Sequence, residues 1–197
     1  MQLSIIIPVK NEAENLNACL HSIRAAASTA VSYEVLVIDN GSEDDTVTIA
    51  KEHNATVHIE PDVTVAGLRN IGAQKACGDI LAFIDADCTV TKNWFNALSP
   101  YLADDSVKTF GSPPGIPEQP TWVQECWYQI RKKGTKENPV VPVEWLESMN
   151  LFVRRDVFNA VNGFDTKLVT CEDYDLHQTD RTWRDYQRCA HPCDPPR

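Results

Sequence analysis

Two carboxylates, Asp85 and Asp87, directly follow an apolar run that extends from Ile80 to Ile84. If the chain stays extended there, both side chains point to the same side, because the side-chain period of a strand is two. Two negative charges about 6 Å apart repel by roughly 3 kcal/mol at an effective dielectric constant of about 20. Such a pair is suited to holding a cation or to shifting a pKa for chemistry. A polar strand end, with Asp87 capping the next turn, is the simpler alternative.

The elements that must position these carboxylates alternate along the first hundred residues. Apolar strands are predicted at 3–9, 33–38, 55–59 and 80–84, and a later one at 151–154. Helical periodicity starts after Asn11, after a cap at Ser42 or Asp44, and at Val65. Continuous apolar strands separated by helices predict an α/β fold, with a mostly parallel central sheet and helices on both faces.

Polar residues gather where these strands end. Ligands of such sheets bind beyond the carboxyl ends of the strands. The sequence places Pro8–Glu12, Asp39–Ser42 and Asp85–Asp87 there. No Gly-x-Gly-x-x-Gly follows the first strand, and no Gly-Lys-Ser/Thr occurs, so neither a dinucleotide fingerprint nor a P-loop is predicted.

The composition excludes other classes of protein. The 197 residues carry a net charge of −10, which argues against nucleic-acid binding because that requires a basic surface. No apolar stretch has the length of a membrane span, and the first apolar segment is too short for a signal peptide. The seven cysteines are scattered and odd in number, which favours reduced, buried thiols.

These observations predict a cytoplasmic protein of one domain. Its basic cluster, Arg131-Lys132-Lys133 with Lys136, is either a solvated face or a surface for an anionic acceptor or membrane headgroups. Peripheral attachment at the inner face of the membrane therefore stays open.

Six segments of the chain follow one another in a characteristic order. They are Ile5–Glu12, Val37–Thr46, Ala66–Gly72, Asp85–Asp87, Phe152–Asp165 and Cys171–Leu176. In this order the chain resembles the family 2 glycosyltransferases, which have a Rossmann-like nucleotide-sugar-binding fold called GT-A. The resemblance covers residues 3 to 176, and six segments in order are specific where each alone is weak. It implies one GT-A domain with a nucleotide-binding half at about 1–90, an acceptor-binding half at about 91–180 and an atypical tail at 181–197.

The resemblance implies a donor site for a nucleotide sugar at the strand ends. The donor is expected to be a UDP-sugar, with GDP- and dTDP-sugars as alternatives. The nucleoside would be held by Pro8, Val9, Glu12 and Asp39, and the diphosphate would lie near Arg69. From the residues alone, Asp39 fits an Asx-turn with Gly41 equally well, and Arg69 fits a surface position on a helix.

The resemblance assigns the Asp-x-Asp element, Asp85-Ala86-Asp87, to the donor diphosphate and a divalent ion. Asp87 is the expected direct ligand of Mg²⁺ or Mn²⁺, and Asp85 is expected nearer the ribose or the waters of the metal. Hard oxygen ligands suit both ions.

The resemblance also places a general base at Asp173, which would deprotonate the acceptor hydroxyl for a single inverting displacement. Glu172, Trp145 and Asn150 are expected around the acceptor, which would be a saccharide or lipid-linked molecule of polysaccharide biosynthesis. Other interpretations stay open: an acidic first helix turn at Glu172 and Asp173, and a core or rim position for Trp145.

The C-terminal residues depart from the family pattern. After Leu176 the chain is polar and lacks the apolar strand that usually follows. A zinc site at Cys189, His191 and Cys193, with His177 or Cys171, matches no common spacing, and a shortened or altered terminus is the favoured interpretation.

Two other functions stay open. Asp85-Ala86-Asp87-Cys88-Thr89-Val90 also matches the nucleophile motif of haloacid-dehalogenase-like phosphatases, in which Asp85 would form a phosphoaspartate. The position of the motif in the chain disfavours this alternative, because in those phosphatases the motif normally ends the first strand, whereas here earlier strands precede it. The second alternative is a non-catalytic nucleotide-sugar-binding remnant.

Overall fold

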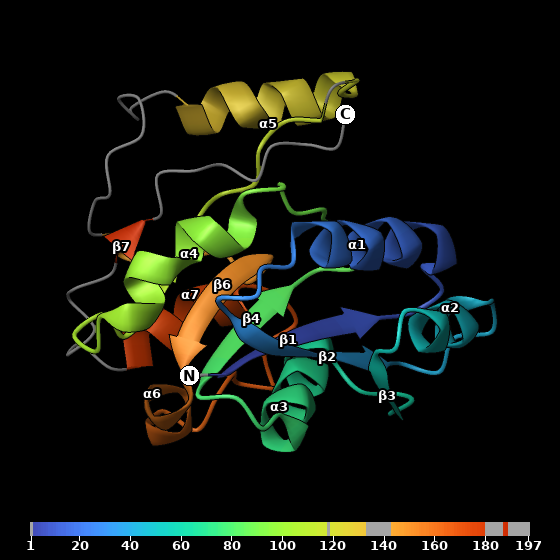
Figure 1. Ribbon diagram of the computed structural model, residues 1–197, viewed down its shortest axis with the longest axis horizontal. Helices are drawn as coiled ribbons and strands as arrows, with labels where there is room; N and C mark the ends of the chain where they lie inside the picture. The colour runs from blue at the N-terminus through green and yellow to red at the C-terminus, as the bar shows by residue number, and fades with distance from the viewer. Residues whose placement is uncertain (1, 118, 133–142, 180–186, 189–197) are drawn as a thin grey trace.

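A computed structural model describes residues 2–117, 119–132, 143–179 and 187–188. In these ranges seven strands form one sheet, in the order β3-β2-β1-β4-β6-β5-β7 (Figure 1). The strands are β1 Gln2–Val9, β2 Ser32–Asp39, β3 Thr56–Ile59, β4 Ile80–Ile84, β5 Thr109–Gly111, β6 Asn150–Arg154 and β7 Gln187–Arg188. The helices are α1 Ala13–Ala26, α2 Thr46–Glu52, α3 Val65–Lys75, α4 Trp94–Ala103, α5 Trp122–Lys132, α6 Arg155–Ala160 and α7 Glu172–Thr179.

The predicted mostly parallel sheet is confirmed. Parallel pairing joins β3 to β2, β2 to β1, and β1 to β4. Strand β6 runs antiparallel between β4 and β5, and β7 pairs parallel to β5. The carboxyl ends of β1, β2 and β4 therefore meet at one edge, together with the amino end of β6.

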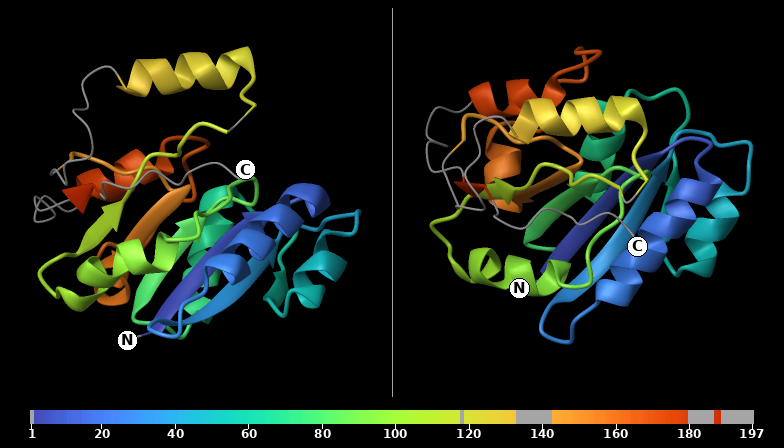
Figure 2. Two further views of the ribbon diagram at one scale, coloured as in Figure 1. Left: turned by 45° about the horizontal axis from the view of Figure 1, so that its top comes forward. Right: turned by 90° about the horizontal axis from the view of Figure 1, so that it is seen from above.

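Helices cover both faces of the sheet, as the apolar strands predicted. Along β1 the side chains of Ile5 and Ile7 enter one core and that of Ile6 enters the other, because alternate residues of a strand face opposite sides. Helices α1 and α4 cover the first face, and α3 and α6 cover the second (Figures 1 and 2).

Helix α3 lies unusually close to the sheet. A Cβ at Gly72 would come within 2.4 Å of Cγ2 of Ile6 and within 3.2 Å of Cγ1 of Ile38. Glycine is therefore required for this approach. The close packing fixes the height of α3 above β1 and β2, and with it the position of Arg69 one turn earlier.

The loop that follows β2 holds the start of α1. Backbone N–H groups of Asn11, Glu12 and Ala13 donate to Ser42 Oγ, Thr46 Oγ1 and Asp44 Oδ2 at 2.8, 3.0 and 3.1 Å. The predicted cap of α2 is therefore corrected. Helix α2 has Asp45, not Ser42 or Asp44, at its N-cap position, without a side-chain capping bond. Asp44 Oδ1 nevertheless accepts from the N–H of Thr46, the first residue of α2, at 3.0 Å, while Ser42 and the other carboxylate oxygen of Asp44 bind the entry to α1.

Helix α5 stands apart from the two layers (Figures 1 and 2). Within the described ranges, no helix has the length and apolar character that a membrane crossing requires. The cysteines were predicted to be reduced and buried. All five described ones are free thiols, but only Cys19 is buried, while Cys77, Cys126 and Cys171 are exposed.

Candidate active site

The chain does not stay extended through Asp85 and Asp87, so that premise of the sequence analysis is corrected. Strand β4 ends at Ile84, and the N–H of Cys88 donates to the carbonyl oxygen of Asp85 at 3.1 Å, which closes a turn. Ala86 is buried inside the turn, Asp85 is half-buried and Asp87 is exposed. The two carboxylates therefore have different surroundings, and Asp85 faces inward.

A buried arginine connects Asp85 to the second acidic motif. Arg69 is 3% exposed. One terminal nitrogen, Nη2, lies 2.7 Å from Oδ1 of Asp85, and the other, Nη1, lies 2.6 Å from Oε1 of Glu172. Two acidic motifs that are far apart in sequence thus share one guanidinium group.

The predicted role of Arg69 near the diphosphate stays a prediction. Both of its terminal nitrogens contact carboxylates, and its guanidinium lies over the ring of Phe164 at 5.7 Å from the centroid. The alternative of a surface position is wrong, because the residue is buried. The side chain instead lies beneath the site, between the two motifs.

The carboxylates of the Asp-x-Asp turn affect the pKa of a cysteine in α1. Burial, followed by the charges of Asp87 and Asp85, raises the pKa of the Cys19 thiol to about 12. Its Sγ lies 3.9 Å from the carbonyl oxygen of Asp85. Cys19 therefore stays protonated and is a packing residue under the turn.

Helix α7 presents the predicted base. Cys171 adopts a φ of +63°, which is uncommon for a residue with a side chain, and the chain turns there directly before Glu172. Glu172 is buried against Arg69, whereas Asp173 is half-buried. The carboxylate of Asp173 accepts from the N–H of Ser148 at 3.3 Å and from that of Tyr174 at 2.8 Å. These bonds hold it at the start of the helix.

A buried histidine supports Asp173 from one turn later. Nδ1 of His177 lies 2.6 Å from the carbonyl oxygen of Asp173, and a carbonyl only accepts, so Nδ1 carries the proton. Burial lowers the pKa of His177, while the hydrogen bond to Asp173 and the charge of Asp173 act in the opposite direction.

An aromatic pair flanks Asp173. The rings of Trp145 and Tyr174 meet edge to face with centroids 6.2 Å apart, and both are partly exposed. Trp145 is thus a rim residue rather than a core residue, with an open surface that a sugar ring can stack on.

A pocket of about 490 Å³ opens at the Asp-x-Asp turn. Its walls come from five segments: Asn15 and Ala18 of α1, residues 84, 85 and 87–90, the loop 114–117, Gln124, Trp127 and Tyr128 of α5, and Met149 with Asn150. This volume lies in the range typical of small-molecule sites. The pocket brings together Asp85, Asp87 and Asn150 among the predicted site residues.

Asn150 is fixed in place by the core. Its Nδ2 donates to Oγ of Ser112 at 2.7 Å, and its Oδ1 accepts from Nε1 of Trp94 at 3.3 Å. Its side chain is 7% exposed, so it supports the pocket wall and offers little surface to an acceptor.

The predicted nucleoside residues lie beside this pocket rather than in its wall. Pro8 and Val9 end β1 next to Asp39 of β2, in register. The Asp39 carboxylate is buried and accepts from the N–H of Ser42 at 2.9 Å and from its hydroxyl. These bonds correspond to the alternative in which Asp39 closes a local Asx-turn, although its partner is Ser42 and not Gly41. Glu12 is half-buried and accepts from Nδ2 of Asn15 at 2.5 Å.

The chemistry of the donor set fits a hard divalent cation that also binds phosphate. Asp87 is an exposed carboxylate on the pocket wall, and Asp85 adds a second one whose Oδ1 contacts Arg69. Among the described residues, no group of three or more His, Cys, Asp or Glu side chains could hold a metal ion. One or two carboxylates completed by phosphate oxygens and water are the usual protein environment of Mg²⁺.

Sequence reasoning missed the part of the site that comes from α1 and α5. The apolar spacing of Trp122, Cys126 and Ile130 would have indicated the helix, although not its position over the pocket. Cys189, His191 and Cys193, the residues of the disfavoured zinc alternative, lie outside the described residues. So do Lys133 and Lys136 of the basic cluster.

The chain matches a family model and named proteins over most of its length. The model of glycosyl transferase family 2 matches residues 4–159. The chain is 32% identical over 191 residues to glycosyltransferase AglE of Haloferax volcanii, an alignment that covers 91% of this chain and 60% of AglE.

Solved structures share the fold. The structure of S. aureus TarS 1-349 in complex with UDP-GlcNAc has a TM-score of 0.77 at 15% identity, covering 98% of this chain and 57% of that one. The mannosyltransferase PcManGT from Pyrobaculum calidifontis, in complex with GDP-Man and Mn²⁺, has a TM-score of 0.73 at 18% identity, covering 96% and 54%. This chain thus spans less than two thirds of each of these proteins. The family match leaves the phosphatase alternative without support.

Proposed function

Because the chain belongs to glycosyl transferase family 2, we propose that it transfers a sugar from a nucleotide sugar to an acceptor hydroxyl, with inversion at the anomeric carbon. The observation that carries this proposal is the contact of Arg69 with both Asp85 and Glu172. It brings the Asp-x-Asp turn of β4 next to the start of α7, where Asp173 is held. The proposed donor site and the proposed base thus lie side by side.

The nucleotide sugar lies along the strand ends in this proposal. The nucleoside contacts the ends of β1 and β2, at Pro8, Val9, Glu12 and Asp39, and the diphosphate lies at Asp85-Ala86-Asp87. A UDP-sugar is the first candidate, and GDP- and dTDP-sugars are the alternatives. Complexes of proteins with this fold contain UDP-GlcNAc and GDP-Man, which supports a nucleotide sugar without choosing the base.

Asp87, with Asp85, would hold Mn²⁺ or Mg²⁺ at the diphosphate. The bound ion would neutralise negative charge on the leaving nucleoside diphosphate. The exposed position of Asp87 on the pocket wall and the Mn²⁺ in complexes of the same fold support this assignment.

Asp173 acts as the general base. Its carboxylate takes the proton of the acceptor hydroxyl while that oxygen attacks the anomeric carbon. The new carbon–oxygen bond forms on the side opposite the diphosphate, whose oxygen leaves with the electron pair of the broken bond. The N–H groups of Ser148 and Tyr174 hold the carboxylate in place for this step.

The acceptor approaches beside Trp145 and Tyr174. Their exposed aromatic surface flanks Asp173 and suits the apolar face of a sugar ring. A saccharide, free or linked to a lipid, is therefore the proposed acceptor.

Replacing the base tests the proposal. Asp173→Asn should lower the rate of nucleoside diphosphate release in the presence of acceptor by about 10²- to 10⁴-fold, because base catalysis contributes that much. Donor affinity should stay unchanged, because the carboxylate does not bind the nucleotide. The rate is measured with a panel of nucleotide sugars and saccharide acceptors, and the affinity by calorimetry.

Asp175→Asn is the matched control, because Asp175 is a half-buried carboxylate in the same helix turn. It should keep the wild-type rate. Equal losses in the two variants would remove the assignment of the base. Donor binding without turnover in the wild type, with every acceptor, would favour the remnant alternative.

A further inference from the structure

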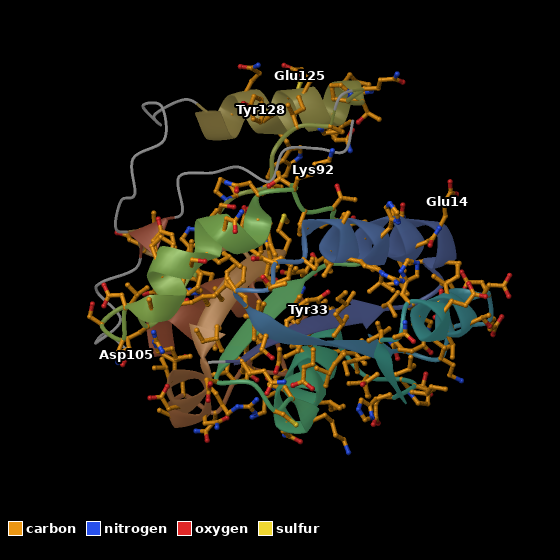
Figure 3. All side chains as sticks on the ribbon, viewed as in Figure 1. Glu14, Tyr33, Lys92, Asp105, Glu125 and Tyr128 are labelled. Carbon is orange, nitrogen blue, oxygen red and sulfur yellow. The ribbon has the colours of Figure 1, made fainter. Side chains whose placement is uncertain are left out.

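Helix α5 has one apolar side. At about 100° per residue, its apolar residues span an arc of about 140°. They are Trp122, Val123, Cys126, Trp127 and Ile130. The rest of the circumference is polar, and the amide of Gln129 donates to the carboxylate of Glu125 at 2.7 Å there. Figure 3 shows Glu125 and Tyr128 on this helix, above the main body of side chains.

Most of the apolar side faces solvent. Trp122 is 79% exposed and Ile130 is 68% exposed, and Cys126 between them is exposed as well. Trp127, at one edge of the arc, lines the pocket together with Gln124 and Tyr128, so the pocket meets that edge while Trp122, Cys126 and Ile130 lie outside its wall. A contiguous exposed apolar surface of this kind indicates an interaction site.

The residue types and charge of α5 indicate a lipid surface. Tryptophan suits the boundary between water and lipid, because its ring is apolar and its N–H is polar. Arg131 and Lys132 form the last residues of the helix, in a chain whose net charge is −10. This positive end complements anionic headgroups, which attract basic residues at the membrane surface.

We infer that α5 is a membrane-surface helix that places Trp122, Cys126 and Ile130 into the headgroup region of an anionic bilayer. The basic end of the helix contacts the headgroups. This docking does not depend on the transfer reaction. If the proposed function is also correct, the pocket that α5 borders is held beside the bilayer, where a lipid-linked acceptor is available.

Vesicle flotation tests the inference with the full chain. Wild-type protein should float with phosphatidylcholine vesicles that contain phosphatidylglycerol, and less with phosphatidylcholine alone. Trp122→Ser combined with Ile130→Ser should lower the bound fraction by about tenfold or more, since binding scales with the apolar area inserted. Arg131→Gln combined with Lys132→Gln should remove the preference for anionic vesicles and the sensitivity to salt.

Ile59→Ser is the matched control, because Ile59 of β3 is also largely exposed, at 58%, but lies outside α5. It should float like the wild type. The inference fails if wild-type protein stays unbound with both kinds of vesicle, or if Ile59→Ser loses as much binding as the α5 variant. It also fails if sedimentation shows a dimer that Trp122→Ser with Ile130→Ser converts to a monomer, because a second copy would then cover the helix.

Discussion

Arg69 is the residue that joins the two acidic motifs. Burying a guanidinium group is costly unless it is paired, and here two carboxylates pair with it on opposite sides. Its Nε is buried and has no hydrogen-bond partner among the residues that the structure describes, and the ring of Phe164 lies under the group. The position of Asp85 is therefore tied to that of Glu172, one residue before the proposed base.

Removing this cation should destabilise the fold. Arg69→Met leaves a buried Glu172 carboxylate without its partner, and breaking a buried ion pair costs about 3–5 kcal/mol. The free energy of unfolding in urea should fall by that amount. Arg24→Met, at an exposed position in the last turn of α1, is the control and should change it by less than about 0.5 kcal/mol.

A second substitution separates charge from packing. Glu172→Gln added to Arg69→Met removes the unpaired charge, so part of the lost stability should return. If Arg69→Met is as mild as Arg24→Met, the buried ion pairs of Arg69 contribute little to stability and do not hold the two acidic motifs together.

The sequence predicted the acidic residues better than their partners. Asp85, Asp87 and Glu172 were visible because carboxylates follow apolar runs or stand in pairs. The burial of Arg69 was not predicted, although Ala66, Gly72 and Ala73 share its face of α3 at helical spacing. A charge inside such a stripe indicates a buried ion pair, but its partners depend on the tertiary fold.

At the scale of elements, α7 combines the proposed base with a buried histidine. Burial lowers the pKa of His177 below its ordinary value of 6.5. The folded state then binds fewer protons than the unfolded state as the pH falls through 6.5, so acid favours unfolding. The contribution of neutral His177 to stability is present above that pH and is lost below it.

The stability of the wild type should therefore fall between about pH 7.5 and about pH 5.5. His177→Gln should flatten this fall, whereas His58→Gln should keep it. Part of the slope remains in His177→Gln because burial also lowers the pKa of His53. Urea unfolding at several pH values measures how the free energy of unfolding depends on pH. If this dependence is the same in His177→Gln as in the wild type, His177 is not held neutral.

The helices and strands of the first ninety residues were predictable because their apolar periodicity is strong. Strands β1, β2, β3 and β4 lie within one or two residues of the predicted ranges. Strand β5 has only three residues and β7 only two, too few for a periodic pattern. Helix α5 has a clear period, but its separation from the domain depends on contacts that no local pattern specifies.

At the scale of the whole molecule, one sheet edge collects the groups of the site. The parallel strands β2, β1 and β4 are neighbours in the sheet, so their three polar carboxyl ends meet at one edge. Antiparallel β6 starts at the same edge with Asn150. This convergence was predictable from the alternation of strands and helices. The positions of α5 and α7 near this edge were not predictable, because both helices are joined to the sheet by long connections.

The most direct test of the central claim is the thermal stability of the chain with nucleoside diphosphates and Mn²⁺. UDP, GDP and dTDP are compared with and without the metal, in the wild type and in Asp87→Asn. One of them, at about a hundredfold over its dissociation constant, should stabilise the wild type by about 2.7 kcal/mol. This effect should require Mn²⁺ and should be lost in Asp87→Asn. Stabilisation by none of the three, or stabilisation that is the same without metal, would contradict a metal-assisted nucleotide-sugar site at Asp85 and Asp87.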